Sequence, residues 1–150
     1  MNTDYTATRM LGYLYRISEP RPEDVVDEML AILSDRNTII QKKELELTQR
    51  AMEGLGALPY VHILGSKDPA NHTGIVSFTI DGVHPHDVSE ILSSDGIDVR
   101  AGHHCAQPLL EYLGVRSSTR ASMMFYNTPE EIDALIESVS TIRRRMGYGE

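Results

Sequence analysis

The sequence has a single cysteine, Cys105, so the chain can form no internal disulfide and gains no covalent staple. It also has no apolar run long enough to cross a membrane. Its first residues, MNTDYTATRM, lack the basic and then apolar layout of a signal peptide. These absences lead us to expect a cytoplasmic protein that does not act at a membrane.

Positive charge is also scarce, because 14 lysines and arginines face 22 aspartates and glutamates, a net charge of −8. Nucleic acids bind to cationic surfaces, so we expect no nucleic-acid partner. The one basic run, residues 143–145, suits the C-terminal end of a helix, where positive charge offsets the helix dipole. The 150 residues, 41% of them hydrophobic, are enough for one domain with a substantial core.

The clearest predicted element is a helix over residues 128–146. Thr128 is its expected N-cap, Pro129 fits the first helical position, and Glu131 completes a capping box. Five apolar residues recur at helical spacing and predict one buried stripe, namely Ile132, Leu135, Ile136, Val139 and Ile142.

The rest of the chain after residue 37 alternates short helical and strand patterns. Helices are predicted over residues 42–56, 84–96 and 108–114, and strands over residues 60–64, 74–80, 97–102 and 118–126. This order predicts an α+β fold, in which helices cover one face of a mostly antiparallel sheet.

The first 37 residues are predicted to be a separate, partly helical N-terminal segment, followed by a domain over residues 38–150. Residues 21–33 have apolar positions at helical spacing and predict a helix of their own. Residues 9–17 alternate like a strand, but the same residues also fit a helix. Both interpretations of residues 9–17 stay open.

Cys105 lies in a predicted loop between a strand and the short helix that begins near Pro108. A nearby helix start, Arg100 and a protonated histidine would all favour the thiolate, which is the reactive form of the thiol. His103 and His104 titrate near neutral pH and are candidates for proton transfer. The alternative is that Cys105 is a small buried hydrophobic residue, as most lone cysteines are.

A metal site is the weaker alternative for these residues. Adjacent histidines point in different directions, and no second cysteine is present to complete a ligand set, so we expect no metal. The sequence HPHD, residues 84–87, is a second tempting ligand pair. Capping of the following helix is the simpler function for its side chains.

Three blocks resemble one enzyme family, and they occur in the same order and with the same spacing. They are GVHPHDVSEIL (82–92), RAGHHCAQPLL (100–110) and TRASMMFYNTPEEID (119–133). Together they resemble the C-terminal, small domain of the Suf-type cysteine desulfurases and selenocysteine lyases. These NifS-like enzymes belong to the class-V aminotransferases and bind pyridoxal phosphate. The similarity runs from about residue 38 to residue 147 and implies the small-domain fold of fold-type-I enzymes.

The resemblance implies roles for several side chains. Cys105 matches the cysteine that attacks the sulfur of the substrate and holds it as a persulfide, for iron–sulfur cluster assembly. Arg120 matches the arginine that binds the carboxylate of cysteine or selenocysteine, a task suited to a planar guanidinium. Arg100 matches an arginine beside the active site. Judged without the resemblance, Arg120 could equally be a surface charge.

One essential residue of the family is missing. The family's Schiff-base lysine lies in a Ser-x-His-Lys context, and Lys42, Lys43 and Lys67 all lack that context. Without pyridoxal phosphate there is no electron sink for breaking the C–S bond, so we expect no desulfurase activity from this chain alone.

Three interpretations follow from the missing lysine. The chain is the small domain cut from a complete enzyme, or encoded apart from it and served by a separate chain that binds pyridoxal phosphate. Alternatively it is a stand-alone sulfur carrier that delivers to an acceptor protein, or an interaction domain whose role is structural, such as dimerisation or docking. The family enzymes are homodimers, so a homodimer is a further alternative.

Overall fold

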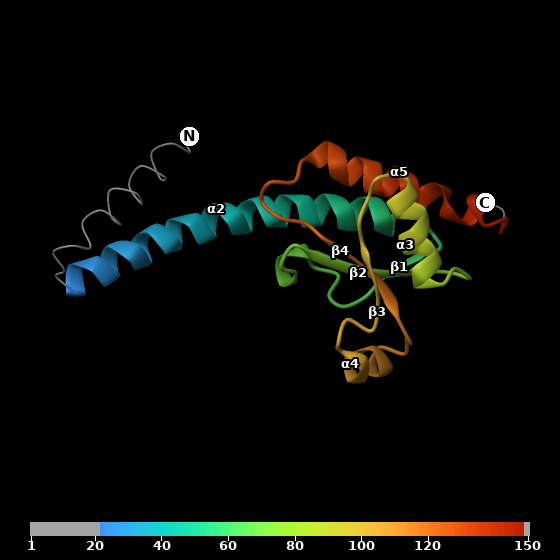
Figure 1. The fold of residues 1–150 in the computed structure, drawn as a ribbon, viewed down its shortest axis with the longest axis horizontal. Helices are drawn as coiled ribbons and strands as arrows, with labels where there is room; N and C mark the ends of the chain where they lie inside the picture. Colours follow the sequence, from blue (N-terminus) through green and yellow to red (C-terminus); the bar gives the residue numbers. More distant parts are fainter. Residues whose placement is uncertain (1–21, 149–150) are drawn as a thin grey trace. The chain divides into compact units, whose positions relative to one another are not determined.

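The computed structural model describes residues 22–148 of the chain (Figure 1). The chain divides into two units, Met1–Ile40 and Gln41–Glu150. Helix α2 (Pro22–Gly56) belongs to the first unit up to Ile40 and to the second from Gln41 onward. The ambiguous segment 9–17 lies outside the described residues, and the expected domain boundary after residue 37 stays a prediction.

Helix α2 corrects one expectation, because residues 21–33 and 42–56 were predicted to form separate helices. The structure has one helix of 35 residues over both ranges. Residues 34–41, SDRNTIIQ, contain neither glycine nor proline. Serine, aspartate, asparagine and threonine have low helix propensity but keep their backbone N–H groups, so they do not end a helix.

The sheet has four strands in the order β1-β2-β4-β3, and each neighbouring pair is antiparallel. The strands are β1 (Val61–Ile63), β2 (Ile75–Ile80), β3 (Arg100–Gly102) and β4 (Ser118–Ser122). The predicted strand over residues 118–126 is therefore too long. A turn replaces its end, because the amide of Met124 donates to Asn127 Oδ1 and the amide of Asn127 donates to the Met124 carbonyl.

The helices α3 (Pro85–Ser94) and α5 (Pro129–Arg145) and the C-terminal part of α2 lie on one face of this sheet (Figure 1). They enclose a core in which Phe78, Leu55 and Val139 have no solvent exposure. The predicted α+β layering is confirmed. A short 3-10 helix, η1 (Pro69–Asn71), was not predicted. No helix among the described residues is long and apolar enough to cross a membrane.

Both predicted helix starts have their capping interactions. Thr128 and Glu131 form the reciprocal capping box of α5, which satisfies two backbone N–H groups. His84 caps α3, because its Nδ1 accepts from the amide of His86 at 3.3 Å. The preference for a capping function over a metal-binding one at His84 agrees with this contact.

Helices α2 and α5 approach each other closely at Gly54. A Cβ atom added there would clash with Ile136 of α5, lying 2.8 Å from its Cγ1 and closer still to its Cδ1. A Cβ atom added at Gly56 would meet only Ile63 Cδ1, at 3.8 Å. The absence of a side chain at residue 54 thus sets the spacing of the two helices.

Replacing this glycine should loosen the helix layer. We expect Gly54→Ala to lower the free energy of unfolding by about 1 kcal/mol or more, because overpacking outweighs the gain in helix propensity. Gly56→Ala is the matched control and should be neutral. Urea unfolding followed by circular dichroism measures both variants. Equal stability of the two would contradict the close packing.

A polar cluster links the end of α3 to α5. Asp95, the C-cap residue of α3, accepts hydrogen bonds from the guanidinium of Arg145 and the hydroxyl of Ser138. The hydrogen bonds from Arg145 and then from Ser138 hold the pKa of Asp95 below its ordinary value of 3.8. The ionised carboxylate therefore stabilises the contact between the two helices.

This cluster predicts a pH-dependent contribution to stability. Because the pKa of Asp95 is lower in the folded state, its contribution is complete above about pH 4 and is lost as the pH falls further. Asp95→Asn should therefore destabilise the protein at pH 7, and the difference from the wild type should shrink in acid. Asp98→Asn, which removes a carboxylate with no arginine partner among the described residues, is the control. A difference that does not change with pH would contradict the assignment.

Candidate functional site

The face of the sheet opposite the helices carries the candidate site. Side chains alternate along a strand, and Thr119 and Ala121 of β4 are buried, so Arg120 between them points to the opposite face. Cross-strand partners share a face, which places Ser77 of β2 and Arg100 of β3 beside Arg120. The structure thus brings two of the predicted site residues together.

The two arginines form a pair of like charges without a counterion. Arg100 and Arg120 are directly opposite in the register of β3 and β4, an arrangement that costs energy. In residues 22–148 neither guanidinium forms an ion pair. The Nε atom of Arg120 is buried and has no hydrogen-bond partner there. Such a pair is suited to bind an anion, and a carboxylate can engage a guanidinium through both oxygens.

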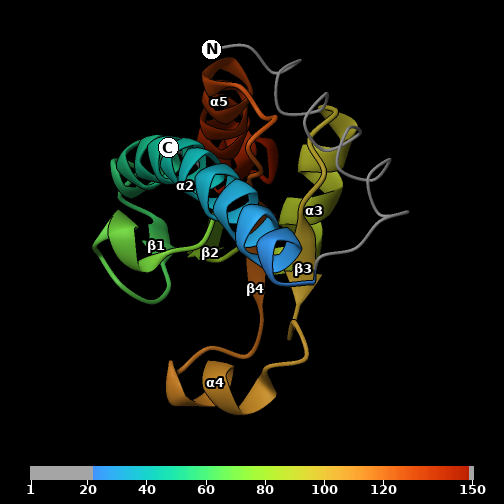
Figure 2. The ribbon, with the colours of Figure 1, turned by 90° about the vertical axis from the view of Figure 1, so that its left-hand side faces the viewer.

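Cys105 lies in the loop between β3 and α4 (Gln107–Tyr112), as the sequence predicted. This connection leads away from the helix layer, and α4 lies at its far end in Figures 1 and 2. The cysteine is a free thiol with an exposed side chain. The alternative of a small buried hydrophobic residue is therefore wrong.

The two histidines before Cys105 differ in their surroundings. His103 is exposed, and no hydrogen bond of its ring is found in the described part of the chain. His104 is half-buried, and its Nε2 lies 3.0 Å from both the carbonyl oxygen and the hydroxyl of Ser118. Burial lowers the pKa of His104, the charges of Arg120, Arg100 and His103 lower it further, and the bond to the Ser118 carbonyl opposes them.

The backbone at the cysteine is strained. His104 and Cys105 have φ values of 53° and 56°, in the left-handed region that residues with a Cβ atom rarely adopt. Such conformations cost about 1–3 kcal/mol each and persist where the surrounding structure holds them. Two in succession turn the chain sharply, so that the Cys105 side chain faces solvent while the ring of His104 contacts β4.

Sequence reasoning missed Ser118 and Ser77, which are the neighbours of the candidate residues on this face. The alternation in STRAS, residues 118–122, was an available signal, because it assigns Ser118 and Arg120 to the same face of the strand. The left-handed conformation had no such signal. Glycine or asparagine normally marks it, and neither occupies residue 104 or 105.

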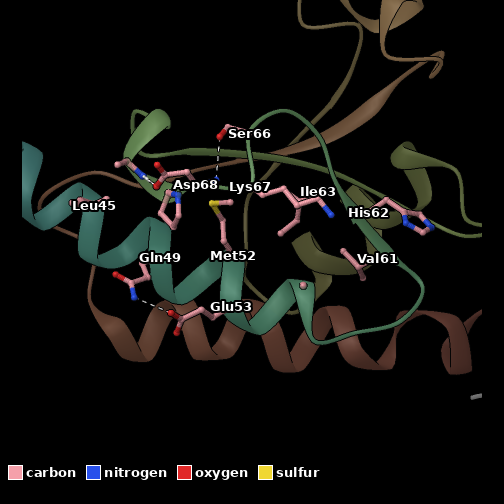
Figure 3. A pocket seen from close by; sticks show the side chains of 13 residues that line it. Leu45, Gln49, Met52, Glu53, Val61, His62, Ile63, Ser66, Lys67 and Asp68 are labelled. Atoms are coloured by element: carbon pink, nitrogen blue, oxygen red, sulfur yellow. Dashed lines mark hydrogen bonds between the residues drawn. The ribbon is translucent and has the colours of Figure 1, made fainter.

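A separate groove of about 710 Å³ lies between α2, β1 and the loop that contains η1 (Figure 3). Met52, Val61 and Ile63 supply its apolar walls, and Glu53 and Lys67 are among its polar groups. None of the predicted site residues lines it. Although it is larger than two other pockets, of about 330 and 270 Å³, we do not assign it to the cysteine chemistry.

The described residues contain no group of three or more histidine, cysteine, aspartate or glutamate side chains that could hold a metal ion. His84 and His86 stack at 5.3 Å between ring centroids, but the Nδ1 atom of His84 is occupied as a helix cap. The functional groups of the candidate residues on this face and its loop are a thiol, two guanidinium groups and two imidazoles.

The strained backbone at Cys105 predicts how substitutions there change stability, whatever the function of the cysteine. Glycine adopts φ near 56° without a steric penalty, whereas alanine keeps the strain. We expect Cys105→Gly to be more stable than Cys105→Ala by about 1 kcal/mol, since an L-residue pays roughly 1–2 kcal/mol for this conformation. Thermal unfolding of the two variants side by side measures the difference. A Cys105→Ala variant that is equally stable would show that residue 105 is not strained.

Comparisons with known proteins agree with this geometry. Residues 26–135 match the family model for class-V aminotransferases. The chain is 46% identical over 109 residues to a probable cysteine desulfurase of Halalkalibacterium halodurans, a match that covers 73% of this chain and 26% of that protein. It is 44% identical over 110 residues to one of Staphylococcus aureus, with the same coverage of each chain. The chain therefore spans about a quarter of the length of these relatives.

Solved structures show the same similarity. The apo structure of the cysteine desulfurase from Thermococcus onnurineus NA1 aligns with a TM-score of 0.71 and 35% identity, covering 81% of this chain and 30% of that one. The S-sulfonic acid form of the cysteine desulfurase CsdA from Escherichia coli aligns with a TM-score of 0.63 and 32% identity, covering 70% and 25%. A C-DES mutant with glycine covalently linked to its PLP cofactor aligns with a TM-score of 0.54 and 25% identity, covering 66% and 23%. By its sequence and its fold, the chain belongs to the class-V aminotransferase family, among the cysteine desulfurases.

Proposed function

We propose that this chain supplies the sulfur-accepting cysteine of a cysteine desulfurase system, with Cys105 as the residue that carries the sulfur. The observation that carries the proposal is the exposure of the single thiol in a strained loop, in a chain whose relatives are cysteine desulfurases. Structural cysteines are buried and inert, whereas reactive ones are accessible and lie near positive charge. The sulfur is mobilised for an acceptor protein, with iron–sulfur cluster assembly as its destination.

The lysines of this chain do not fit pyridoxal phosphate at the Cys105 face. Lys42 and Lys43 lie on α2 in the helix layer, and the amine of Lys43 pairs with Glu46 at 3.2 Å. Lys67 lines the separate groove beside β1. Bound pyridoxal phosphate supplies the electron sink for cleaving a C–S bond. That cleavage therefore belongs to a polypeptide segment or chain that holds the cofactor, and Cys105 receives the released sulfur.

The transfer to Cys105 balances without an external oxidant. The Cys105 thiolate attacks the terminal sulfur of a persulfide on the donor, forming a new S–S bond. The S–S bond of the donor breaks, and its thiol leaves as a thiolate that takes up the proton released by Cys105. The exposed ring of His103 is free to carry that proton, whereas Nε2 of His104 is already bonded to Ser118.

The arginine pair serves substrate binding in this proposal. Where the donor is the persulfide of an amino acid, Arg120 binds its carboxylate and Arg100 adds positive charge beside it; cysteine or selenocysteine is the amino acid that the pair would recognise. The buried, unpartnered Nε of Arg120 supports this role, because a buried donor without a partner is costly and a carboxylate would satisfy it. A carboxylate would also offset the repulsion between the two guanidinium groups.

An interaction domain is the second candidate, and exposed apolar residues on α4 favour it. Leu109 and Tyr112 are 56% and 86% exposed, and they follow the Cys105 loop directly. A docking site there would bring an acceptor or donor protein to the thiol. In the sulfur-carrier proposal this surface assists the transfer, whereas a pure interaction domain would not need Cys105. A homodimer is a further proposal for the assembly.

Mass spectrometry of Cys105 tests the proposal. The chain is incubated with cysteine and pyridoxal phosphate, with and without a complete desulfurase. We expect a mass increase of one sulfur atom on Cys105 only when the desulfurase is present, and none on Cys105→Ser. Alanine release by the chain alone would make it an enzyme in its own right. Binding to the desulfurase with no sulfur on Cys105 would favour the interaction domain.

The arginine pair gives a second prediction when the persulfide of free cysteine is the sulfur donor. Arg120→Ala should lower the initial rate of sulfur transfer on the order of tenfold or more, because a charge-assisted hydrogen bond is worth about 1.5–3 kcal/mol. Arg116→Ala, which removes an exposed arginine of the loop before β4, is the matched control and should leave the rate unchanged. Equal rates for the two variants would remove Arg120 from substrate binding.

A further inference from the structure

His104 connects the cysteine loop to the sheet. Its Nε2 contacts both polar oxygens of Ser118, and Ser118 is fully buried in β4. Among the hydrogen bonds of the described residues, this is the one side-chain bond that joins residues 103–106 to another element. Ser118 precedes Arg120 by two residues and lies on the same face of β4. The bond therefore couples the residue next to Cys105 to the strand that carries Arg120.

The contact fixes the tautomer of the ring. A carbonyl oxygen only accepts hydrogen bonds, so Nε2 must carry the proton that is donated to Ser118. In the neutral ring Nδ1 is then unprotonated, and this atom is buried without a partner. Protonation of Nδ1 would bury an N–H group and a positive charge with no acceptor, which is far more costly.

The surroundings of His104 also oppose a charged ring. The charged and titratable groups that face it are Arg120 on β4, Arg100 on β3 and His103 in the loop, all of which carry positive charge when ionised. Burial is the largest cause that lowers the pKa of His104 below its ordinary value of 6.5. The ring is therefore neutral at neutral pH.

The same bond supports the strained backbone. A conformation with φ near 53° and 56° at two successive residues persists only where neighbouring contacts hold it. The hydrogen bond from His104 to Ser118 is such a contact, and its loss would allow the loop to relax to ordinary φ values. Relaxation would change the direction of the Cys105 side chain.

We propose that neutral His104 is a positioning residue, which holds the Cys105 loop on β4 in one conformation and releases it when the ring becomes protonated. The hold of His104 on β4 follows from the structure, and its consequence for sulfur transfer rests on the proposed function. His104 does not transfer the proton of the thiol in this proposal. It acts on the reaction only through the conformation of residue 105.

A spin label on Cys105 tests the proposal without any sulfur chemistry. The single cysteine takes a nitroxide label uniquely, and the EPR line shape reports the mobility of the loop. We expect a mobile label in His104→Ala and a wild-type line shape in His104→Gln, because the glutamine amide can donate to Ser118 in place of Nε2. His103→Ala is the matched control for mobility. An unchanged line shape in a folded His104→Ala would overturn the proposal.

The pH dependence of the label's mobility distinguishes a positioning residue that responds to protonation from a contact that is only structural. The label in the wild type should become more mobile as the pH falls below about 6.5, whereas His104→Gln should show no such change. If His104→Ala does not fold, ¹⁵N NMR of the wild-type ring decides the question. We expect a proton on Nε2 and a titration midpoint below that of a free histidine. A proton on Nδ1, or the midpoint of a free histidine, would contradict the proposal.

A measurement of sulfur transfer tests whether the conformation of the loop affects the reaction. The initial rate of persulfide formation on Cys105 should fall at least about tenfold in His104→Ala, since small misplacements of reacting groups cost large factors in rate. His104→Gln should restore the rate and make it less sensitive to acid. If no variant, including the wild type, takes up sulfur, the proposed function fails. The EPR and NMR results still decide whether His104 positions the loop.

Discussion

The one-sided burial of a four-stranded sheet is the constraint from which the rest of the structure follows. Helices α3 and α5 and the C-terminal part of α2 cover a single face, so the alternation of side chains along each strand assigns every residue either to the core or to the opposite face. Val76 and Phe78 of β2 and Ala121 of β4 occupy the core. The same rule places Ser118 and Arg120 of β4 on the other face, together with Arg100 of β3, which is distant from them in sequence.

Several local rules of stability are broken on that face and its connecting loop. Within residues 22–148, two guanidinium groups face each other without a counterion, the buried Nε atom of Arg120 has no partner, and two successive residues are left-handed. The core around Phe78 and Val139 is mostly apolar, although the buried hydroxyl groups of Thr48 and Thr119 also lack partners among the described residues. Unfavourable features that gather at one place indicate a site selected for binding or chemistry, because selection for stability alone would remove them.

The sequence predicts the elements of this fold better than it predicts the site. The capping box of Thr128 and Glu131 and the period-2 pattern of β2 are local signals, and the structure contains both. The absence of glycine and proline from residues 34–41 was an available signal for one continuous α2. The bond from His104 to Ser118 spans 14 residues and depends on how β3 pairs with β4. No local sequence pattern predicts this long-range bond, and no residue type at positions 104 and 105 predicts their left-handed backbone.

The charges of the site also distinguish the groups present in this chain from those that C–S bond cleavage needs. The face around Arg120 gathers the positive charge of Arg120 and Arg100, and the loop after β3 carries an exposed thiol. None of the lysines lies on that face, so the electron sink needed to break a C–S bond has no attachment point there. A cationic pair without a counterion is more stable when an anion binds. In the proposed function this unit binds a carboxylate and holds sulfur, while C–S cleavage belongs to a cofactor-bearing segment, and the chain spans about a quarter of the length of its relatives.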